Sequence, residues 1–141
     1  MSARLTIALV VAGLLALPSA AAAATKHGIT PLAPKAGSSV PAGKSPTFKM
    51  RVKGKGPVWV RVCRSKKRDK YGLICKKAEL GRARKKGGSF RFKPTFFDFP
   101  AFWLNTPATY YWQVYRIACE GSDLSDCYQE GPIVKFKVAG G

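Results

Sequence analysis

Apolar and polar residues alternate one by one in several short runs of this chain. The runs cover residues 48–53, 58–63, 89–93, 110–119 and 133–138, and a weaker run covers 74–80. Successive side chains of a β-strand point to opposite faces, so a period of two predicts strands with one buried face. Glycine and proline separate the runs, and no stretch after residue 25 carries the period of an amphipathic helix. Short strands at this spacing predict an all-β chain with a β-sandwich fold.

The first 24 residues have the pattern of a secretory signal peptide. Arg4 precedes an uncharged apolar run over residues 5–17, Pro18 ends the run, and small residues fill positions 19–24. The run has 13 residues, whereas a membrane-spanning helix needs about 20. We therefore expect cleavage within the small-residue segment and release of a secreted, extracellular protein.

Four segments of the remaining chain resemble a bacterial fibronectin type III or immunoglobulin-like module. They are Thr-Pro-Leu-Ala-Pro-Lys-Ala-Gly at 30–37, Phe-Lys-Met-Arg-Val at 48–52, Pro-Ala-Thr-Tyr-Tyr-Trp-Gln-Val at 107–114 and Val-Lys-Phe-Lys-Val at 134–138. The resemblance implies a seven-stranded antiparallel β-sandwich, and from the cysteine positions we expect disulfide-stapled hairpins. Such modules serve as spacers, adhesins and ligand binders alike, so no function follows from the fold. The expected organisation is a signal peptide at 1–24, a flexible start at 25–29 and one domain at 30–139.

Four cysteines can be paired if the sandwich interpretation holds. Cys63 and Cys75 would then flank one hairpin, and Cys119 and Cys127 would flank another at the opposite end of the sheet. Cross-pairing would span a strand length, far beyond the roughly 4.4–6.8 Å between Cα atoms that a disulfide permits. We therefore predict the bridges Cys63–Cys75 and Cys119–Cys127. A four-cysteine zinc site is the less favoured alternative, because the chain has no Cys-x-x-Cys pair.

The sequence contains few residues suited to catalysis, and we expect a non-catalytic protein without a cofactor. His27, the one histidine, lies in the expected flexible start, where it has no rigid element to hold it beside a nucleophile. Cleavage after Ala24 would place His27 third behind a free amine, a four-nitrogen set that suits Cu²⁺ or Ni²⁺. A solvated tail histidine is the simpler interpretation.

Two further clusters allow a functional and a structural interpretation. Acidic residues gather in and next to the loop that Cys119 and Cys127 would close, where oxygen ligands for Ca²⁺ or a simple solvated loop are both conceivable. They are Glu120, Asp123, Asp126 and Glu130. Five aromatic residues lie within 96–103. They form either an exposed platform for a ligand or, as we expect, a buried connection between sheets.

Positive charge is the remaining feature that bears on function. The chain has 25 Lys+Arg against 7 Asp+Glu, a formal net charge of +18, which favours an anionic partner. If the strands at 48–53 and 89–93 are neighbours in one sheet, their polar residues share an outer face. We predict that this face and the adjacent loop bind polyanions through Lys49, Arg51, Lys53, Arg91, Lys93, Arg82, Arg84, Lys85 and Lys86.

Two classes of function are compatible with these observations. One is a secreted binding module for an anionic polymer or cell-envelope surface, such as a wall polymer, an acidic polysaccharide, nucleic acid or a membrane surface. The alternative is a secreted structural or accessory domain that contacts other proteins and has no dedicated polyanion site. Like charges on one sheet face repel each other, and solubility alone is better served by mixed signs, so we favour the first.

Overall fold

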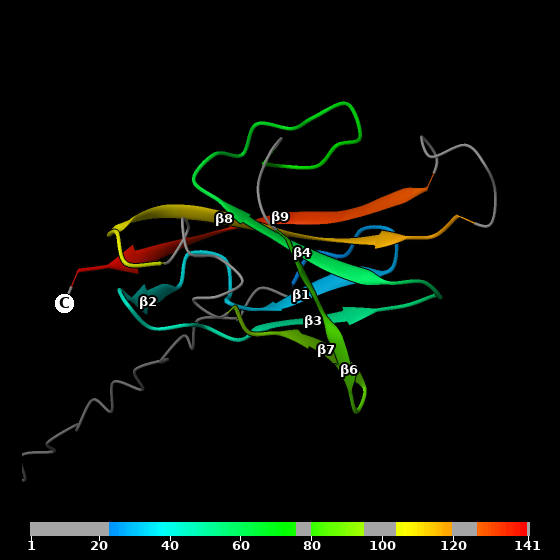
Figure 1. The fold of residues 1–141 in the computed structure, drawn as a ribbon, viewed down its shortest axis with the longest axis horizontal. Coiled ribbons are helices and arrows are strands. Elements are labelled where there is room, and N and C mark those ends of the chain that lie inside the picture. Colours follow the sequence, from blue (N-terminus) through cyan, green and yellow to red (C-terminus); the bar gives the residue numbers. More distant parts are fainter. Residues whose placement is uncertain (1–22, 76–79, 95–103, 120–126, 141) are drawn as a thin grey trace, which may run out of the picture.

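The fold is taken from a computed structural model that describes residues 23–75, 80–94, 104–119 and 127–140 (Figure 1). Most of the expected signal peptide, the aromatic segment 96–103 and the acidic residues Glu120, Asp123 and Asp126 lie outside the described residues.

All regular structure in the described residues is β-strand, arranged in two sheets (Figure 1). The strands are β1 (Ile29–Ala33), β2 (Ser39–Pro41), β3 (Phe48–Val52), β4 (Val58–Cys63), β5 (Leu80–Arg82), β6 (Arg84–Lys86), β7 (Ser89–Phe92), β8 (Ala108–Ile117) and β9 (Tyr128–Ala139). One sheet has the order β1-β3-β7-β6 and the other has the order β2-β9-β8-β4-β5. The predicted all-β, sandwich-like class is confirmed.

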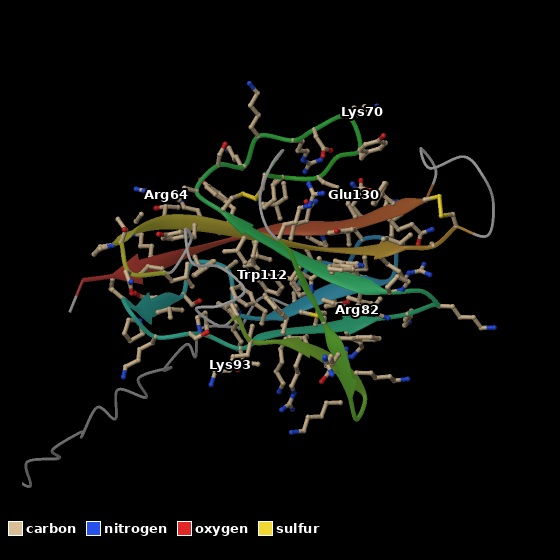
Figure 2. All side chains as sticks on the ribbon, in the orientation of Figure 1. Arg64, Lys70, Arg82, Lys93, Trp112 and Glu130 are labelled. Atoms are coloured by element: carbon tan, nitrogen blue, oxygen red, sulfur yellow. A yellow bond between two sulfur atoms is a disulfide. The ribbon has the colours of Figure 1, made fainter. Side chains whose placement is uncertain are left out.

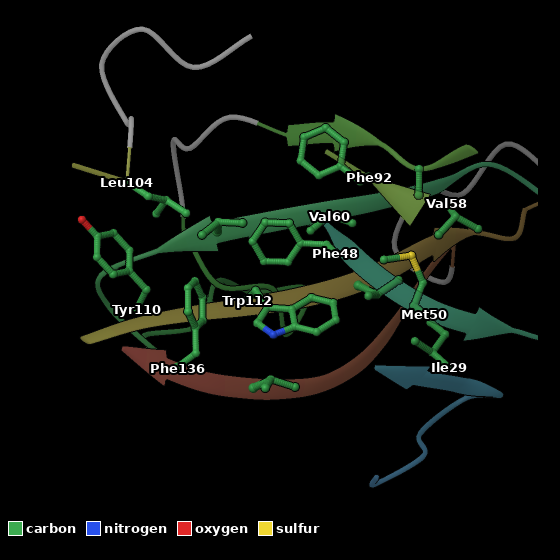
Figure 3. Packing of buried hydrophobic residues seen from close by; sticks show 14 of the residues in the cluster. Ile29, Phe48, Met50, Val58, Val60, Phe92, Leu104, Tyr110, Trp112 and Phe136 are labelled. Carbon is green, nitrogen blue, oxygen red and sulfur yellow. The ribbon is translucent and has the colours of Figure 1, made fainter. Parts of the chain in front are cut away.

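The apolar residues of the alternating runs form one core between the two sheets (Figure 3). Phe48 of the four-stranded sheet packs against Trp112 and Phe136 of the five-stranded sheet, with ring centroids 5.2 and 6.0 Å apart. Trp112 is fully buried, and its indole Nε1–H donates a hydrogen bond of 3.1 Å to the carbonyl of Pro34. The apolar face of each alternating run is therefore the face that the sandwich buries.

The expected count of seven strands is not confirmed, because two segments divide between the sheets. The segment at 29–41 forms β1, which pairs with β3, and then β2, which pairs with β9 in parallel. The segment at 80–86 forms β5 beside β4 and β6 beside β7, with Ala83 between them. The described residues thus form nine strands, and one pairing is parallel in an otherwise antiparallel arrangement.

Both predicted disulfides are present. Cys63 and Cys75 are joined with their Cα atoms 5.9 Å apart, and Cys119 and Cys127 with theirs 4.4 Å apart. The predicted strand at 74–80 is wrong at its start, since Cys75 has a positive φ of 65° outside any strand. Residues 76–79 lie outside the described residues, and β5 covers Leu80–Arg82. Two disulfides indicate folding in an oxidising compartment.

The hydrogen-bonded fold begins before the expected domain boundary at residue 30. Ile29 is fully buried, and it exchanges backbone hydrogen bonds of 2.9 and 3.0 Å with Lys26. Lys26 Nζ also donates a hydrogen bond of 2.7 Å to a carboxylate oxygen of Glu130 on β9. Residues 26–29, expected as a flexible start, are therefore a turn that contacts the sandwich.

The loop 64–75 covers part of the outer face of the five-stranded sheet. Gln113 of β8 is fully buried beneath it and accepts a hydrogen bond of 3.0 Å from the Ile74 N–H. Arg61 of β4 donates to the carbonyl of Ile74 at 3.0 Å and lies over the Tyr115 ring at 5.2 Å. Burial raises the pKa of Tyr115, although the neighbouring Arg61 charge and hydrogen bond act against this rise. Because the loop 64–75 lies on the outer face of the five-stranded sheet, its exposed lysines lie on the opposite side of the molecule from β3 and β7.

Candidate anion-binding face

Three basic residues form one row across the outer face of the four-stranded sheet. Lys49 of β3 lies directly opposite Arg91 of β7, and Arg91 lies directly opposite Arg84 of β6. The alternate residues of β3 and β7, which include Phe48 and Phe92, are buried in the core. Because side chains alternate along a strand, the row Lys49–Arg91–Arg84 faces away from the core.

The same alternation adds further basic residues to this face. Arg51 follows Lys49 on β3, and Lys86 pairs across from Ser89, two residues before Arg91. Lys53 and Lys93 are the residues directly after the ends of β3 and β7. We call this set the cationic face. Its members are Lys49, Arg51, Lys53, Arg84, Lys86, Arg91 and Lys93. Lys49 and Arg91 are half-buried and the other five are exposed. Long basic side chains project from the sandwich around the labelled Lys93 and the β6–β7 hairpin (Figure 2).

Two of the nine predicted residues lie elsewhere. Arg82 belongs to β5 in the other sheet, where it pairs across from Trp59. Lys85 pairs across from Phe90, so it lies on the opposite side of β6 from Arg84 and Lys86. The structure therefore groups seven of the nine residues on one face. Arg82 is separated because the chain changes sheets at Ala83, and Lys85 is separated because side chains alternate along β6.

The described acidic residues are paired away from the cationic face. Asp69 lies 3.4 Å from Arg61, and Glu130 lies 2.7 Å from Lys26. No ion pair within the described ranges involves a member of the cationic face. The Arg91 Nε atom is buried and has no hydrogen-bond partner among the described residues. The positive charge of this face is thus left uncompensated by the part of the chain that the structure describes.

The pKa of the Glu130 carboxyl is shifted because of its contacts with the turn at residues 26–29. Burial alone would raise the pKa of this carboxyl. A hydrogen bond from Lys26, a backbone hydrogen bond and the charges of Lys26 and His27 outweigh burial and lower the pKa below 4.5. Glu130 is therefore ionised in the folded protein and contributes to holding the turn.

The metal hypotheses receive no support from the geometry of the described residues. His27 Nδ1, the atom that would bind Cu²⁺ or Ni²⁺ in an N-terminal site, lies 2.9 Å from the carbonyl oxygen of Glu130. Glu130, the described member of the acidic cluster, pairs with Lys26. Within the described ranges, no group of three or more His, Cys, Asp or Glu side chains is arranged to hold a metal ion. The same ranges contain no helix long and apolar enough to cross a membrane.

A hollow that the sequence did not indicate lies at the edge where β5 passes into β6. Its volume is about 900 Å³. Its lining residues come from both sheets and from the turn before β4. They are Gly56, Pro57, Val58, Gly81, Arg82, Ala83, Arg84, Lys85, Phe90, Arg91, Phe92 and Lys93. The alternating pattern predicted the inward positions of Phe90 and Phe92, but the hollow depends on the crossing at Ala83, which no feature of the sequence indicates.

Comparison of the chain with protein-family models, curated proteins and solved structures finds no match. The geometry of the cationic face and of the hollow is therefore the basis for inferring function.

Proposed function

We propose that this chain is a secreted, non-catalytic binding module that engages anionic polymers through its cationic face. The observation that supports this proposal most is the position of Arg91, with Lys49 directly opposite on one side and Arg84 on the other. Like charges directly opposite each other in a sheet destabilise it. A row of three such residues therefore lowers stability, and binding an anionic partner would offset that cost.

The fold proposed for this module is immunoglobulin-like or fibronectin type III-like. The order β1-β3-β7-β6 corresponds to strands A, B, E and D of such domains, and β9-β8-β4 corresponds to G, F and C. The Tyr110 hydroxyl, near the start of β8, donates a hydrogen bond of 3.1 Å to the Thr106 carbonyl. A tyrosine at the start of strand F that bonds back to the upstream backbone is typical of this fold. Both features support the proposal.

A sheet face with several basic residues suits a polymer with regularly repeated negative charges. Adjacent strands lie about 4.8 Å apart and alternate residues of one strand about 6.8 Å apart, so the cationic face presents charges at two short, regular spacings. An extended polyanion can contact several of these charges at once, whereas a single small anion would contact one or two. The face therefore favours polymers over small anions.

The experiment compares two variants with the same loss of charge. In the face variant, Lys49, Arg51, Lys53, Arg91 and Lys93 are replaced by Gln. In the loop variant, Arg64, Lys66, Lys67, Arg68 and Lys70 are replaced by Gln; these five exposed residues lie on the other side of the molecule. Each variant loses three lysines and two arginines. Retention on immobilised heparin, polyphosphate and duplex DNA is then measured over a salt gradient, and circular dichroism confirms that both variants fold.

We expect the face variant to lose most of its retention and the loop variant to keep most of it. Retention should also be stronger on one polymer than on others of equal charge density, because a dedicated site binds best to negative charges at a matching spacing. Equal losses of retention in the two variants would show that retention depends on the net charge and not on where the charge lies. That result would support the alternative, a secreted structural or accessory domain that contacts other proteins.

A further inference from the structure

The hollow beside β5 and β6 differs in chemistry from the cationic face. It lies at the edge where the chain crosses from one sheet to the other, and two of its lining residues, Arg82 and Lys93, are labelled in Figure 2. Its volume of about 900 Å³ lies within the range of roughly 300–1,000 Å³ that small-molecule sites occupy. Lys49, Arg51 and Lys53, which define one strand of the cationic face, do not line it.

The inner wall of the hollow is apolar. Val58 and Phe92 are buried core residues, and Phe90 is half-buried against the core. Gly81 is required at this wall, because a Cβ at that position would collide with the Phe92 ring. The Phe92 ring therefore lies directly against the backbone of β5 at Gly81. An apolar group can therefore lie against Phe90 and the adjacent wall.

The rim of the hollow is basic. Five of its lining residues are Arg82, Arg84, Lys85, Arg91 and Lys93, and none of its lining residues is acidic. The two carboxylates that the described part of the chain contains, Asp69 and Glu130, pair with Arg61 and with Lys26. The buried Arg91 Nε has no hydrogen-bond partner in the described ranges. A ligand in the hollow would therefore be favoured if it carried negative charge at the rim.

We propose that the hollow binds an amphiphilic anion, in which a phosphate or carboxylate group is joined to an aliphatic chain. The anionic group pairs with the basic rim, and the chain lies against Phe90 and the apolar wall. This site goes beyond the proposed polymer binding, since it adds Arg82 and Lys85, which the cationic face does not include, to Arg84, Arg91 and Lys93, which the two sites share. Its ligand is also small and partly apolar rather than an extended polyanion.

The test is isothermal titration of the folded mature protein with octyl phosphate, below its critical micelle concentration. Inorganic phosphate tests the anionic group alone, and octyl glucoside tests the chain without charge. We expect octyl phosphate to bind with one-to-one stoichiometry and at least about tenfold more tightly than either. A tenfold difference corresponds to about 1.4 kcal/mol. Equal binding of inorganic phosphate, or of octyl glucoside, would overturn the proposal.

Two double variants locate the binding. Arg82→Gln with Lys85→Gln is expected to weaken octyl phosphate binding about tenfold. The matched control, Arg68→Gln with Lys66→Gln, removes the same residue types from the loop 64–75 and should change it less than about twofold. An equal loss in both variants would show that octyl phosphate is attracted only by net charge, and the proposed site would be wrong.

Two further arms separate this site from other interactions. Lys49→Gln with Arg51→Gln and Lys53→Gln should lower retention on polymers and leave octyl phosphate binding unchanged, so either proposal can fail without the other. Vesicles of phosphatidylglycerol present the same chemistry within a bilayer. Binding to vesicles without one-to-one binding of monomeric octyl phosphate would overturn the hollow as the site.

Discussion

Lys49 and Arg91 lie directly opposite each other where β3 pairs with β7, on the side of the sheet that faces away from the core. Arg91 has a second basic residue, Arg84, opposite it on β6. A sheet gains stability from opposite charges at such positions and loses it from like charges. The like charges of this row therefore lower the stability of the sheet, and the same charges are the ones that we propose bind the polymer.

Replacing Lys49 by Glu is expected to raise stability and weaken polymer binding together. The glutamate would pair with Arg91 instead of repelling it, a gain of about 0.5–1 kcal/mol in the free energy of unfolding. Chemical denaturation measures this gain, and retention on heparin measures the loss of binding. Lys44→Glu, at an exposed turn, is the matched control for the change in net charge. A loss of stability in the Lys49→Glu variant would contradict the proposed repulsion.

The cationic face could be predicted from the sequence because it depends on local alternation. Phe48, Met50, Phe90 and Phe92 fix which side of each strand is buried, and the basic residues between them must then face outward. The pairing of the Phe48 and Phe90 strands followed from the resemblance to known sandwiches. The structure pairs these two strands as expected, with Lys49 opposite Arg91 on the outward side, and polyanion binding by this face stays a prediction.

The positions of Arg82 and Lys85 could not be predicted in the same way. Lys85 lies on the opposite side of β6 from Arg84 because a strand, and not a loop, begins at Arg84. Arg82 belongs to the other sheet because the chain changes sheets at Ala83, where Gly81 lies against the Phe92 ring and the Ala83 N–H donates a hydrogen bond of 2.9 Å to the Val58 carbonyl. Both are contacts between residues distant in the sequence. The turn at 26–29 was missed for the same reason, since its partner, Glu130, lies 104 residues from Lys26.

Replacing Gln113 by Leu is expected to lower the free energy of unfolding by roughly 3–5 kcal/mol. The fully buried amide accepts from the Ile74 N–H and donates to the carbonyls of Gly72 and Gly131, at 3.0–3.2 Å. Leucine would leave all three backbone groups without these partners, and burying an unpaired polar group is costly. Urea denaturation followed by tryptophan fluorescence measures the change.

A control for this prediction is Gln129→Leu. Gln129 is half-buried and accepts a hydrogen bond from Arg116, so its loss should cost less than half as much. Equal effects of the two substitutions would show that Gln113 does not hold the loop 64–75 against the sheet.

The ion pair between Glu130 and Lys26 predicts a specific dependence of stability on pH. The pKa of Glu130 is lower in the folded protein than its ordinary value of 4.5. The folded state therefore binds this proton less readily than the unfolded state, and the stabilisation is fully present above pH 4.5. It is lost as the pH falls through the lowered folded-state pKa.

Comparison of the protein with its Glu130→Gln variant isolates this effect from other carboxyl groups. The wild-type protein should have the higher Tm at about pH 6, and the difference in Tm should shrink as the pH falls to about 3. Differential scanning calorimetry at several pH values measures both. A difference in Tm that stays constant over this range would mean that Glu130 titrates alike in the folded and unfolded states.

The salt dependence of polymer binding reports how many members of the cationic face contact the polymer. Contacts between basic residues and a duplex release condensed counterions, and log K falls with log salt by about 0.9 for each phosphate neutralised. If about six of the seven residues engage duplex DNA, affinity should fall roughly a thousandfold between about 50 and 200 mM salt. Replacing Lys49, Arg51 and Lys53 by Gln should then reduce the slope by about 2.7. The same number of Gln substitutions at Lys66, Lys67 and Arg68 should leave the slope nearly unchanged, because these residues lie on the other side of the sandwich, away from the bound polymer. Fluorescence anisotropy titrations at four or more salt concentrations would give both slopes, and a similar decrease in each would argue against a single binding face.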